Sequence, residues 1–435
     1  MTLQSRLWPR RADMPIQFSG AGLSSATIDA DPGYDDRSEG CVMTQPPSSD
    51  SSPLRHELLT AVDSIRDTLL AEIDGQEQNA ELSRVSADAL YDAGILRMKL
   101  PAVLGGHEAD LVTQFEVIEA LARISPAAAW CAMVGTTSLG LPGAFLPDAG
   151  AAKMFSAGRI PRGAVLIMPT GQATAVAGGY RLSGRWAFAS GVQHAEWISA
   201  HALVRETPQG APVLFMLVFP ANDITLHDNW QVLGLRGTGS CDISVTDIFV
   251  PNELAWNVAT QTPQRGGCLY ELGIPAFVSY EHAAFALGLA RSVLDELTGL
   301  AIEKRRGYGP GAPSLADRPA LQRFIGHSDM RLRAARALTM TLNEQAMDVV
   351  ASGAKPTTRL ALELRSSAVY CTEVGTEIIN QAFRYSGAAA IFEGQLMQRC
   401  LRDISVAAQH LMVSEIAYEL LGKTHLGFED VRPMG

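Results

Sequence analysis

The chain has 435 residues, of which 47% are hydrophobic and 19% are charged, and its formal net charge is -11. This profile is typical of a globular protein large enough for two or three domains. The acidic balance argues against nucleic acid or an anionic membrane as the main partner, because both need a basic surface.

The cysteines and histidines point to no metal and no disulfide. The six cysteines form no CxxC pair, which indicates free thiols in the cytoplasm. The nine histidines include no HExxH motif, so no metal site is predicted. No apolar run reaches the ~20 residues of a membrane span, and no hydrophobic segment follows Arg10-Arg11, so we predict no signal peptide.

Residues 1–53 differ in composition from the rest of the chain. They are rich in Gly, Ser, Pro and Asp, and they end in the run QPPSSDSSP. Such a segment buries too little apolar surface to offset its ordering entropy, so we predict a disordered N-terminal extension. Met43 is an alternative start, in which case residues 1–42 are absent from the native protein.

Residues 54–162 are predicted to form an N-terminal helical domain. Apolar side chains follow helical spacing from Leu58 to Ile73. A second helical run covers about 81–97, and Pro101 and Gly105-Gly106 then mark a loop. A further helix and an apolar segment at 126–139 complete this part of the chain.

Residues 163–262 are predicted to form a middle β domain. The continuous apolar run 213–219 lies between two prolines, as expected of a buried strand. Alternating apolar residues on both sides of Ser183-Gly184 predict a hairpin over 179–189. Short strands without intervening helices favour an antiparallel sheet or barrel.

Residues 263–435 are predicted to form a C-terminal helical bundle. Long helical segments lie near 275–304, 317–350, 357–384 and 396–421, with Gly- and Pro-rich breaks between them. Pro319 suits the first turn of its helix, with Asp317 as a candidate cap. The fold class is therefore α+β, in the order helical domain, β domain, helical bundle.

Several motifs occur in the order found in one large family. Residues 178–191 read GGYRLSGRWAFASG and residues 234–242 read GLRGTGSCD. A PAVLGG loop begins at Pro101, SPAAAW begins at Ser125, and Leu401-Arg402-Asp403 precedes AAQH. Together these motifs, spanning about 54–425, resemble the acyl-CoA dehydrogenase superfamily, and in particular its branch of two-component flavin-dependent monooxygenases.

The residues near the C-terminus favour an oxygenase over a dehydrogenase. A dehydrogenase of this family needs a carboxylate to take the acyl α-proton. No carboxylate occurs among residues 404–413, and His410 stands one position before the place of the usual Glu. The imidazole of His410 titrates in the range that suits an acid or base near neutral pH. If the base lies elsewhere in the bundle, Glu281 and Glu373 are the candidates.

The resemblance implies roles for further residues. The predicted catalytic residues are His410 and Ser190, with the Ser190 hydroxyl at the ring nitrogen of the flavin. The other predicted flavin-binding residues are Trp186, Phe188, Arg236, Thr238 and Arg305, the last reaching the flavin phosphates of a neighbouring subunit. The predicted substrate-pocket residues are Trp130, Met133 and Ser138.

Most of these residues have a structural alternative. Trp186 and Phe188 alternate as core residues of a hairpin would, and the three pocket residues fit plain core. Arg305 also suits the C-terminal end of a helix, where a cation complements the helix dipole. Arg402-Asp403 is interpreted as a structural ion pair on or between helices.

The resemblance implies the oxygenase component of a two-component monooxygenase. Such a protein takes reduced FMN or FAD from a separate flavin reductase, reacts it with O2, and oxygenates a small substrate through a flavin hydroperoxide. We expect an aromatic or heteroatom-containing substrate and a homotetramer. Two alternatives stay open: an acyl-CoA dehydrogenase with a relocated base, and a scaffold of this fold that has lost catalysis.

Overall fold

The structure is a computed structural model that describes residues 52–434 apart from 157–158, 206–209 and 306–311. The predicted disorder of residues 1–53 and the alternative start at Met43 lie outside the described residues, except that Ser52 and Pro53 begin the first helix. The contacts of the described chain form one unit from Ser52 onward, and the predicted division into domains at 162 and 262 stays a proposal.

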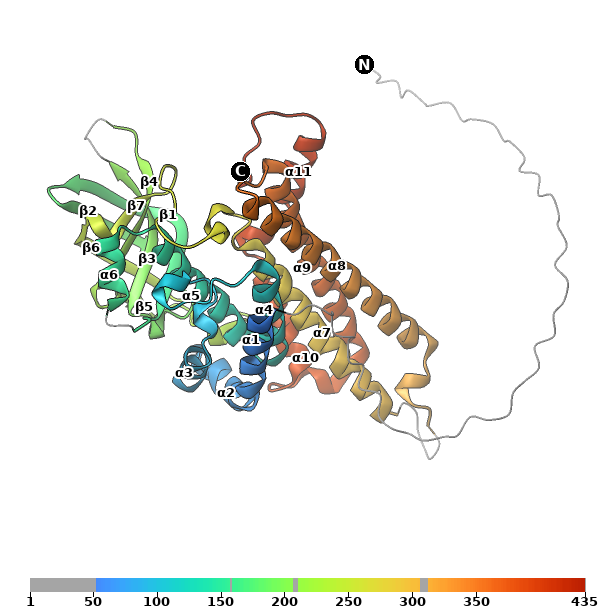
Figure 1. Cartoon of the computed structure of the whole chain (residues 1–435). Helices are drawn as coiled ribbons and strands as arrows, with labels where there is room; N and C mark the ends of the chain where they lie inside the picture. Colours follow the sequence, from blue (N-terminus) through green and yellow to red (C-terminus); the bar gives the residue numbers. More distant parts are fainter. Residues whose placement is uncertain (1–51, 157–158, 206–209, 306–311, 435) are drawn as a thin grey trace, which may run out of the picture. The chain divides into compact units, whose positions relative to one another are not determined.

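The N-terminal part of the described chain is helical, as predicted (Figure 1). Ser125 accepts a hydrogen bond from the amide of Ala128 and Pro126 occupies the first turn, so the sequence SP starts a new helix directly after another ends. The elements are α1 (Pro53–Ser64), α2 (Arg66–Asn79), α3 (Arg84–Asp92), α4 (Leu111–Ile124), α5 (Pro126–Phe145) and α6 (Asp148–Met154).

In the described chain seven strands form one sheet in the order β5-β6-β2-β1-β3-β4-β7. Most neighbouring strands are antiparallel, as predicted, but β1 and β3 are parallel. The strands are β1 (Gly163–Val176), β2 (Gly179–Trp186), β3 (Trp197–Arg205), β4 (Val213–Pro220), β5 (Thr225–His227), β6 (Asp242–Pro251) and β7 (Ala255–Asn257).

The predicted hairpin over 179–189 is wrong. Residues 179–186 are one strand, and the hairpin turn lies earlier, between β1 and β2, where Val176 pairs with Gly179. Ser183-Gly184 instead marks a shift in the register between β2 and β6. Gly184 is needed there for space, because a Cβ would lie 2.7 Å from the ring of Trp186.

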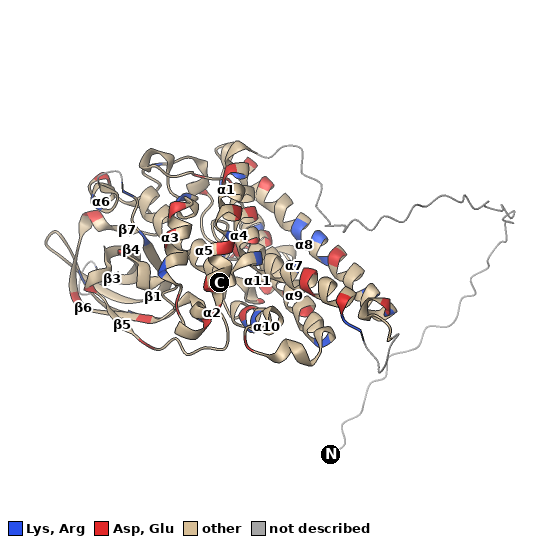
Figure 2. Ribbon diagram, turned by 90° about the horizontal axis from the view of Figure 1, so that it is seen from below, with Lys and Arg blue, Asp and Glu red and all other residues tan. Residues whose placement is uncertain are grey.

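The C-terminal part of the described chain is a bundle of long helices that run side by side (Figure 1). Helix α7 packs along both α9 and α4, and α10 packs against α9 and α7. The bounds are α7 (Ser279–Glu303), α8 (Pro319–Ala351), α9 (Thr358–Ser386), α10 (Leu396–Ala407) and α11 (Ile416–His425). Both basic and acidic residues lie along α8, as expected of a solvated helix surface (Figure 2).

Two details of the bundle differ from the prediction. The segment 396–421 is not one helix, because α10 ends at Ala407 and α11 begins only at Ile416, with a short 3-10 turn, η11 (Leu411–Val413), between them. Asp317 does not cap α8; its carboxylate accepts from the amide of Ser314 in a capping box one turn earlier. None of the described helices is both long and apolar enough to cross a membrane.

Candidate active site

The indole of Trp130 joins the helical bundle to the β domain. On α5 it meets the rings of His282, Phe285 and His410 edge-on, with centroids 5.5, 5.3 and 5.6 Å away. Its Nε1 donates a hydrogen bond of 3.2 Å to the hydroxyl of Ser190. The structure therefore brings the two predicted catalytic residues, Ser190 and His410, to the same side chain.

His410 lies in the break between α10 and η11 rather than on a helix. Its Nδ1 accepts a hydrogen bond of 3.2 Å from the amide of Met412 and so caps η11. A nitrogen that accepts from an amide carries no proton, so the neutral ring holds its proton on Nε2. The break in the helix thus orients the imidazole and selects its tautomer.

A second imidazole lies against the first. The ring of His282, on α7, stacks on that of His410 with centroids 4.3 Å apart. Burial lowers the pKa of His410 to about 4. Burial, with the nearby charges of His410 and Lys99, lowers the pKa of His282 well below its usual value. Both rings are therefore neutral at pH 7.

Sequence reasoning assigned no role to His282. The signal that points to it is weak: three residues separate it from Phe285, so both side chains lie on one face of α7 and reach the same indole. This spacing is visible in the sequence, but it becomes informative only once Trp130 is known to lie opposite.

Ser190 lies on a loop that two backbone hydrogen bonds attach to a second loop. The amide of Ala189 donates to the carbonyl of Cys241 (3.0 Å), and the amide of Gly191 donates to that of Thr238 (2.9 Å). The FASG and GTGS motifs thus form one paired structure at the end of the sheet. Between them, the Ser190 hydroxyl lies 2.6 Å from that of Ser240.

The surroundings of Ser190 fit an aromatic ring that carries an anion. Phe188, two residues before Ser190, is 67% exposed, and its φ of 66° is a conformation that bulky residues rarely adopt. Its ring meets that of Trp230 edge-on at 6.2 Å. Among the described residues the buried Nε of Arg236 has no hydrogen-bond partner. An exposed aromatic platform and an unpaired guanidinium nitrogen are features that a bound flavin would satisfy.

The other predicted site residues lie away from this exposed surface. Trp186 is fully buried in the β domain and donates to the carbonyl of His201, which favours a packing role. The Thr238 hydroxyl is also fully buried and bonds within its own loop. Ser138 packs against Gly163, whereas Met133, three residues after Trp130, lies on the Trp130 face of α5.

The chain is similar to known proteins in sequence and in fold. Residues 280–415 match the family model "Acyl-CoA dehydrogenase, C-terminal domain". Indole-3-acetate monooxygenase from Pseudomonas putida is 29% identical over 89% of this chain and 97% of its own. The oxygenase subunit HsaA of a flavin-dependent monooxygenase from Rhodococcus jostii is 27% identical over 83% and 97%. The structure of XiaF from Streptomyces sp., in complex with FADH2 and glycerol, superposes with a TM-score of 0.78 at 23% identity, over 87% of this chain and 97% of that one.

Residues 280–415 therefore match the C-terminal domain of the acyl-CoA dehydrogenases. The full-length relatives named above are monooxygenases, and the one from R. jostii is named as flavin-dependent. The expected acyl-CoA dehydrogenase-like fold is thereby confirmed, including the helical, β and helical order of its elements.

The carboxylates that a dehydrogenase of this superfamily would use are engaged elsewhere. Glu281 is buried and bonds to the ammonium of Lys99, with Nζ to Oε2 at 2.7 Å. Glu373 is exposed and accepts a hydrogen bond from the hydroxyl of Tyr418. On α7 the residue that faces His410 is therefore His282, and its neighbour Glu281 points to another partner.

Lys99 and Glu281 are the second feature that sequence reasoning missed. The Lys99 ammonium also donates to the hydroxyl of Thr137 and to the carbonyl of Phe277, each at 2.9 Å. Burial raises the pKa of Glu281 to about 7 and lowers the pKa of Lys99, although each partner opposes the shift of the other. A charged pair in an apolar segment leaves no local signal in the sequence.

Arg305 lies far from this cluster within the same chain. It follows the C-terminal end of α7, and 23 residues of helical rise separate it from His282, roughly 34 Å. Its guanidinium is exposed and, among the described residues, donates a long hydrogen bond, 3.3 Å, to the carbonyl of Ala312. At this distance Arg305 does not reach the cluster of its own chain.

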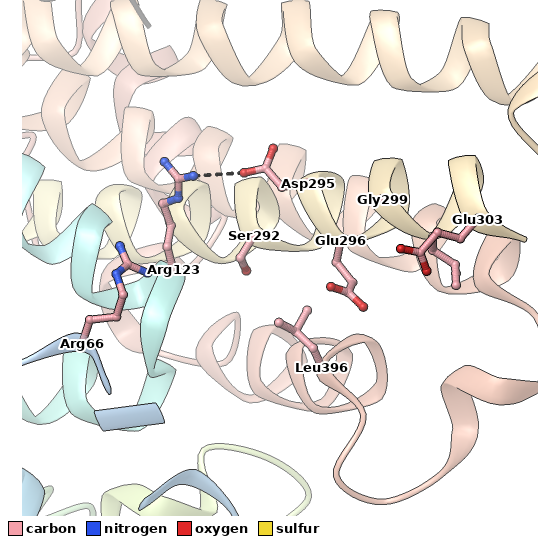
Figure 3. Close-up of a pocket in the computed structure, with 9 residues that line it drawn as sticks. Arg66, Arg123, Ser292, Asp295, Glu296, Gly299, Glu303 and Leu396 are labelled. Atoms are coloured by element: carbon pink, nitrogen blue, oxygen red, sulfur yellow. Dashed lines mark hydrogen bonds and ion pairs between the residues drawn. The ribbon is translucent and has the colours of Figure 1, made fainter. Parts of the chain in front are cut away.

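A cavity of the described chain lies elsewhere (Figure 3). It has a volume of about 440 Å³ and lies between α2, α4, α7 and α10, where Arg123 pairs with Asp295 and the carboxylates of Glu296 and Glu303 point inward. None of the predicted site residues lines it. Its charged lining does not suit chemistry that must exclude water.

Proposed function

We propose that this protein is the oxygenase component of a two-component flavin-dependent monooxygenase. It takes reduced FMN or FAD from a separate reductase and uses O2 to hydroxylate or oxygenate a small aromatic or heteroatom-containing substrate. The observation that carries the proposal is the joining of Ser190 and neutral His410 through Trp130, where a dehydrogenase would need a carboxylate.

Each residue of the cluster has a role in this proposal. Bound reduced flavin supplies the electrons that activate oxygen. Ser190 would accept a hydrogen bond from the ring, and Phe188 and Arg236 would hold the ring and its anionic part. Trp130 and Phe285 exclude water. His410 presents Nε2–H as a hydrogen-bond donor.

The dehydrogenase alternative is disfavoured by the environment of its two candidate bases. Glu281 would have to leave Lys99 in a fully buried site, and the exposed Glu373 would have to leave Tyr418. Two neutral imidazoles, by contrast, offer hydrogen bonds without a permanent charge in the pocket.

We further propose a separate reductase as the partner, a homotetrameric assembly and a small aromatic substrate. The relative from R. jostii is named as an oxygenase subunit, which supports a separate reductase. The exposed Arg305 supports a homotetramer in which each flavin site receives an arginine from a neighbour. The relative from P. putida is named for an indole compound, which supports a small aromatic substrate. The free thiols of the described cysteines agree with a cytoplasmic location.

The deciding experiment mixes the protein and anaerobically reduced flavin with oxygenated buffer in a stopped-flow spectrometer. We expect a transient absorbance that free reduced flavin does not give, and substrates that gain one oxygen atom by mass spectrometry. Bleaching of tightly bound oxidised FAD by an acyl-CoA would support the dehydrogenase. Oxidation at the rate of free flavin would support a scaffold without catalysis.

A variant links the expected activity to His410. His410→Asn removes the Nε2–H donor of the ring, so we expect about a hundredfold lower rate of substrate oxygenation. The matched control is His227→Asn in the edge strand β5, where the ring hydrogen-bonds to the hydroxyl of Ser244. If both variants keep the parent rate, His410 has no catalytic role.

A further inference from the structure

Three buried hydroxyl groups form a chain that ends at Ser190. The Ser190 hydroxyl lies 2.6 Å from that of Ser240, and the Ser240 hydroxyl lies 2.7 Å from that of Thr238. The Thr238 hydroxyl in turn lies 2.8 Å from the carbonyl oxygen of Leu235. All three side chains are at least 94% buried, with relative exposures of 6%, 3% and 0%.

The direction of every hydrogen bond in this chain follows from counting protons. The Leu235 carbonyl has no proton to give, so at 2.8 Å the Thr238 hydroxyl must donate to it. Thr238 has then used its only proton and can only accept from Ser240. Ser240 has in turn used its proton, so it can only accept from Ser190.

Ser190 is therefore left with acceptor capacity alone. Its proton points at Ser240, and one of its two lone pairs accepts from the indole of Trp130. A single lone pair stays available to a ligand. A ligand atom that carries a proton completes the set of hydrogen bonds, whereas a ligand atom with only a lone pair meets repulsion.

The backbone prevents the chain of hydroxyls from rearranging easily. The amide of Gly191 holds the carbonyl of Thr238, and the side-chain amide of Gln193 donates to the carbonyl of Gly239 at 2.9 Å. Gly239 has a φ of 53°, and a Cβ there would lie 2.4 Å from Gln193. The turn that carries Thr238 and Ser240 is thus fixed against the loop of Ser190.

We propose that Ser240 and Thr238 are positioning residues that fix Ser190 as a hydrogen-bond acceptor and so make the site prefer reduced over oxidised flavin. The central ring nitrogen carries a proton in reduced flavin and only a lone pair in oxidised flavin. This inference rests on the proposed function, because it takes Ser190 to contact that nitrogen. The fixed direction of the Ser190 hydroxyl is then the physical reason why reduced flavin binds more tightly than oxidised flavin.

The test compares the affinities for the two forms of one flavin, FMN, in the parent and in variants. Thr238→Val keeps the shape of the side chain but removes its hydroxyl, the last of the three hydrogen-bonded hydroxyl groups. Ser240 can then turn its proton toward Ser190, which frees the Ser190 proton for the ligand. We expect about tenfold tighter binding of oxidised FMN with little change for reduced FMN. The midpoint potential of bound FMN then becomes about 30 mV more negative, the value for a tenfold change in a two-electron couple.

Further variants separate orientation from packing. Ser240→Ala removes the acceptor of the Ser190 proton and should shift the affinity ratio in the same direction. Thr238→Ser keeps the hydroxyl and should restore the parent ratio. Thr339→Val, in a buried part of α8 where the hydroxyl donates to the carbonyl of Ala335, is the control for loss of a buried threonine.

The outcomes distinguish the inference from the function on which it rests. If the parent binds neither form of FMN or FAD, the proposed function fails. If the parent binds flavin but Thr238→Val and Ser240→Ala keep its affinity ratio, the inference alone is overturned. If Thr238→Val does not fold, as judged by circular dichroism, the ratio in Ser240→Ala decides.

Discussion

His282 and His410 stack in one apolar environment, and this shared burial sets their chemistry. Neither ring has a carboxylate within hydrogen-bond range among the described residues, and the charged group that affects His282 beyond its partner ring is Lys99. Two imidazolium cations with ring centroids 4.3 Å apart would repel strongly, so the neutral pair takes up at most one additional proton. The sequence predicted His410 as a site residue, but not that a second imidazole faces it.

The shared burial predicts how stability depends on pH. Between pH 6.5 and 4 the unfolded chain binds protons on both rings, whereas the folded chain keeps them neutral. The free energy of unfolding therefore falls as the pH falls through this window, by about 3 kcal/mol for His410. Urea unfolding of the parent and of His282→Gln at pH 7 and pH 4.5 measures the effect. The variant should lose less stability on acidification, and equal losses would contradict the assignment.

At the scale of elements, α7 meets the N-terminal helical part through a buried ion pair. Lys99 follows the 3-10 turn η1 (Ile95–Arg97), and Glu281 lies in the first turn of α7. Gly140 permits this approach, because a Cβ there would lie 2.7 Å from the Lys99 carbonyl. The periodicity of the sequence predicted both helical segments, but periodicity does not encode which charged residues meet across them.

Replacing one partner of the Lys99–Glu281 ion pair should lower the free energy of unfolding more than replacing both. Lys99→Met leaves the Glu281 carboxylate buried without its cation, so we expect a loss of about 3–5 kcal/mol. The loss should grow above pH 7, where Glu281 is ionised. The double variant Lys99→Met with Glu281→Met should recover most of the stability in urea unfolding. A double variant no more stable than the single one would show that the pair does not act as a unit.

A second contact between elements joins the Leu401-Arg402-Asp403 motif to the GLRGTGSCD motif. The carboxylate of Asp403, on α10, accepts from the amide of Leu235 at 2.6 Å, and burial raises its pKa to about 7. Arg402 reaches Glu77 on α2 and the carbonyl of Leu233. The structural interpretation of this motif is therefore correct, but Arg402 and Asp403 bond to other elements rather than to one another.

A substitution at Gly234 tests this contact, because a Cβ there would lie 2.2 Å from the Arg402 carbonyl oxygen. Gly234→Ala should displace the loop from α10 and destabilise the protein by about 1–3 kcal/mol. Gly422→Ala is the matched control, because nothing lies within 4 Å of its Cβ position and alanine favours the helix α11. Thermal unfolding should show a lower midpoint for the first variant and not for the second.

At the scale of the whole molecule, the cluster around Trp130 and the predicted phosphate ligand Arg305 lie at opposite ends of α7. One chain therefore does not bring all the predicted flavin-binding residues together. If the resemblance holds for Arg305, the flavin site is completed by a second copy of the chain.

This arrangement predicts that flavin affinity depends on assembly. Arg305→Ala removes a charge-assisted hydrogen bond to phosphate, so we expect about tenfold weaker binding of reduced flavin. The exposed Arg323 on α8 supplies the control variant Arg323→Ala. Flavin titration together with analytical ultracentrifugation measures both affinity and assembly. A monomeric protein, or unchanged affinity in Arg305→Ala, would contradict the shared site.

The sequence alone determined the order of helices and strands, the presence of the FASG and GTGS motifs, and His410 in place of a carboxylate. These features are local, because apolar periodicity, Gly and Pro act over a few residues. The tertiary structure decided that His282 faces His410, that Lys99 neutralises Glu281, and that Ser190 accepts rather than donates. Those properties depend on burial and on distances between residues far apart in the chain, and no local pattern carries them.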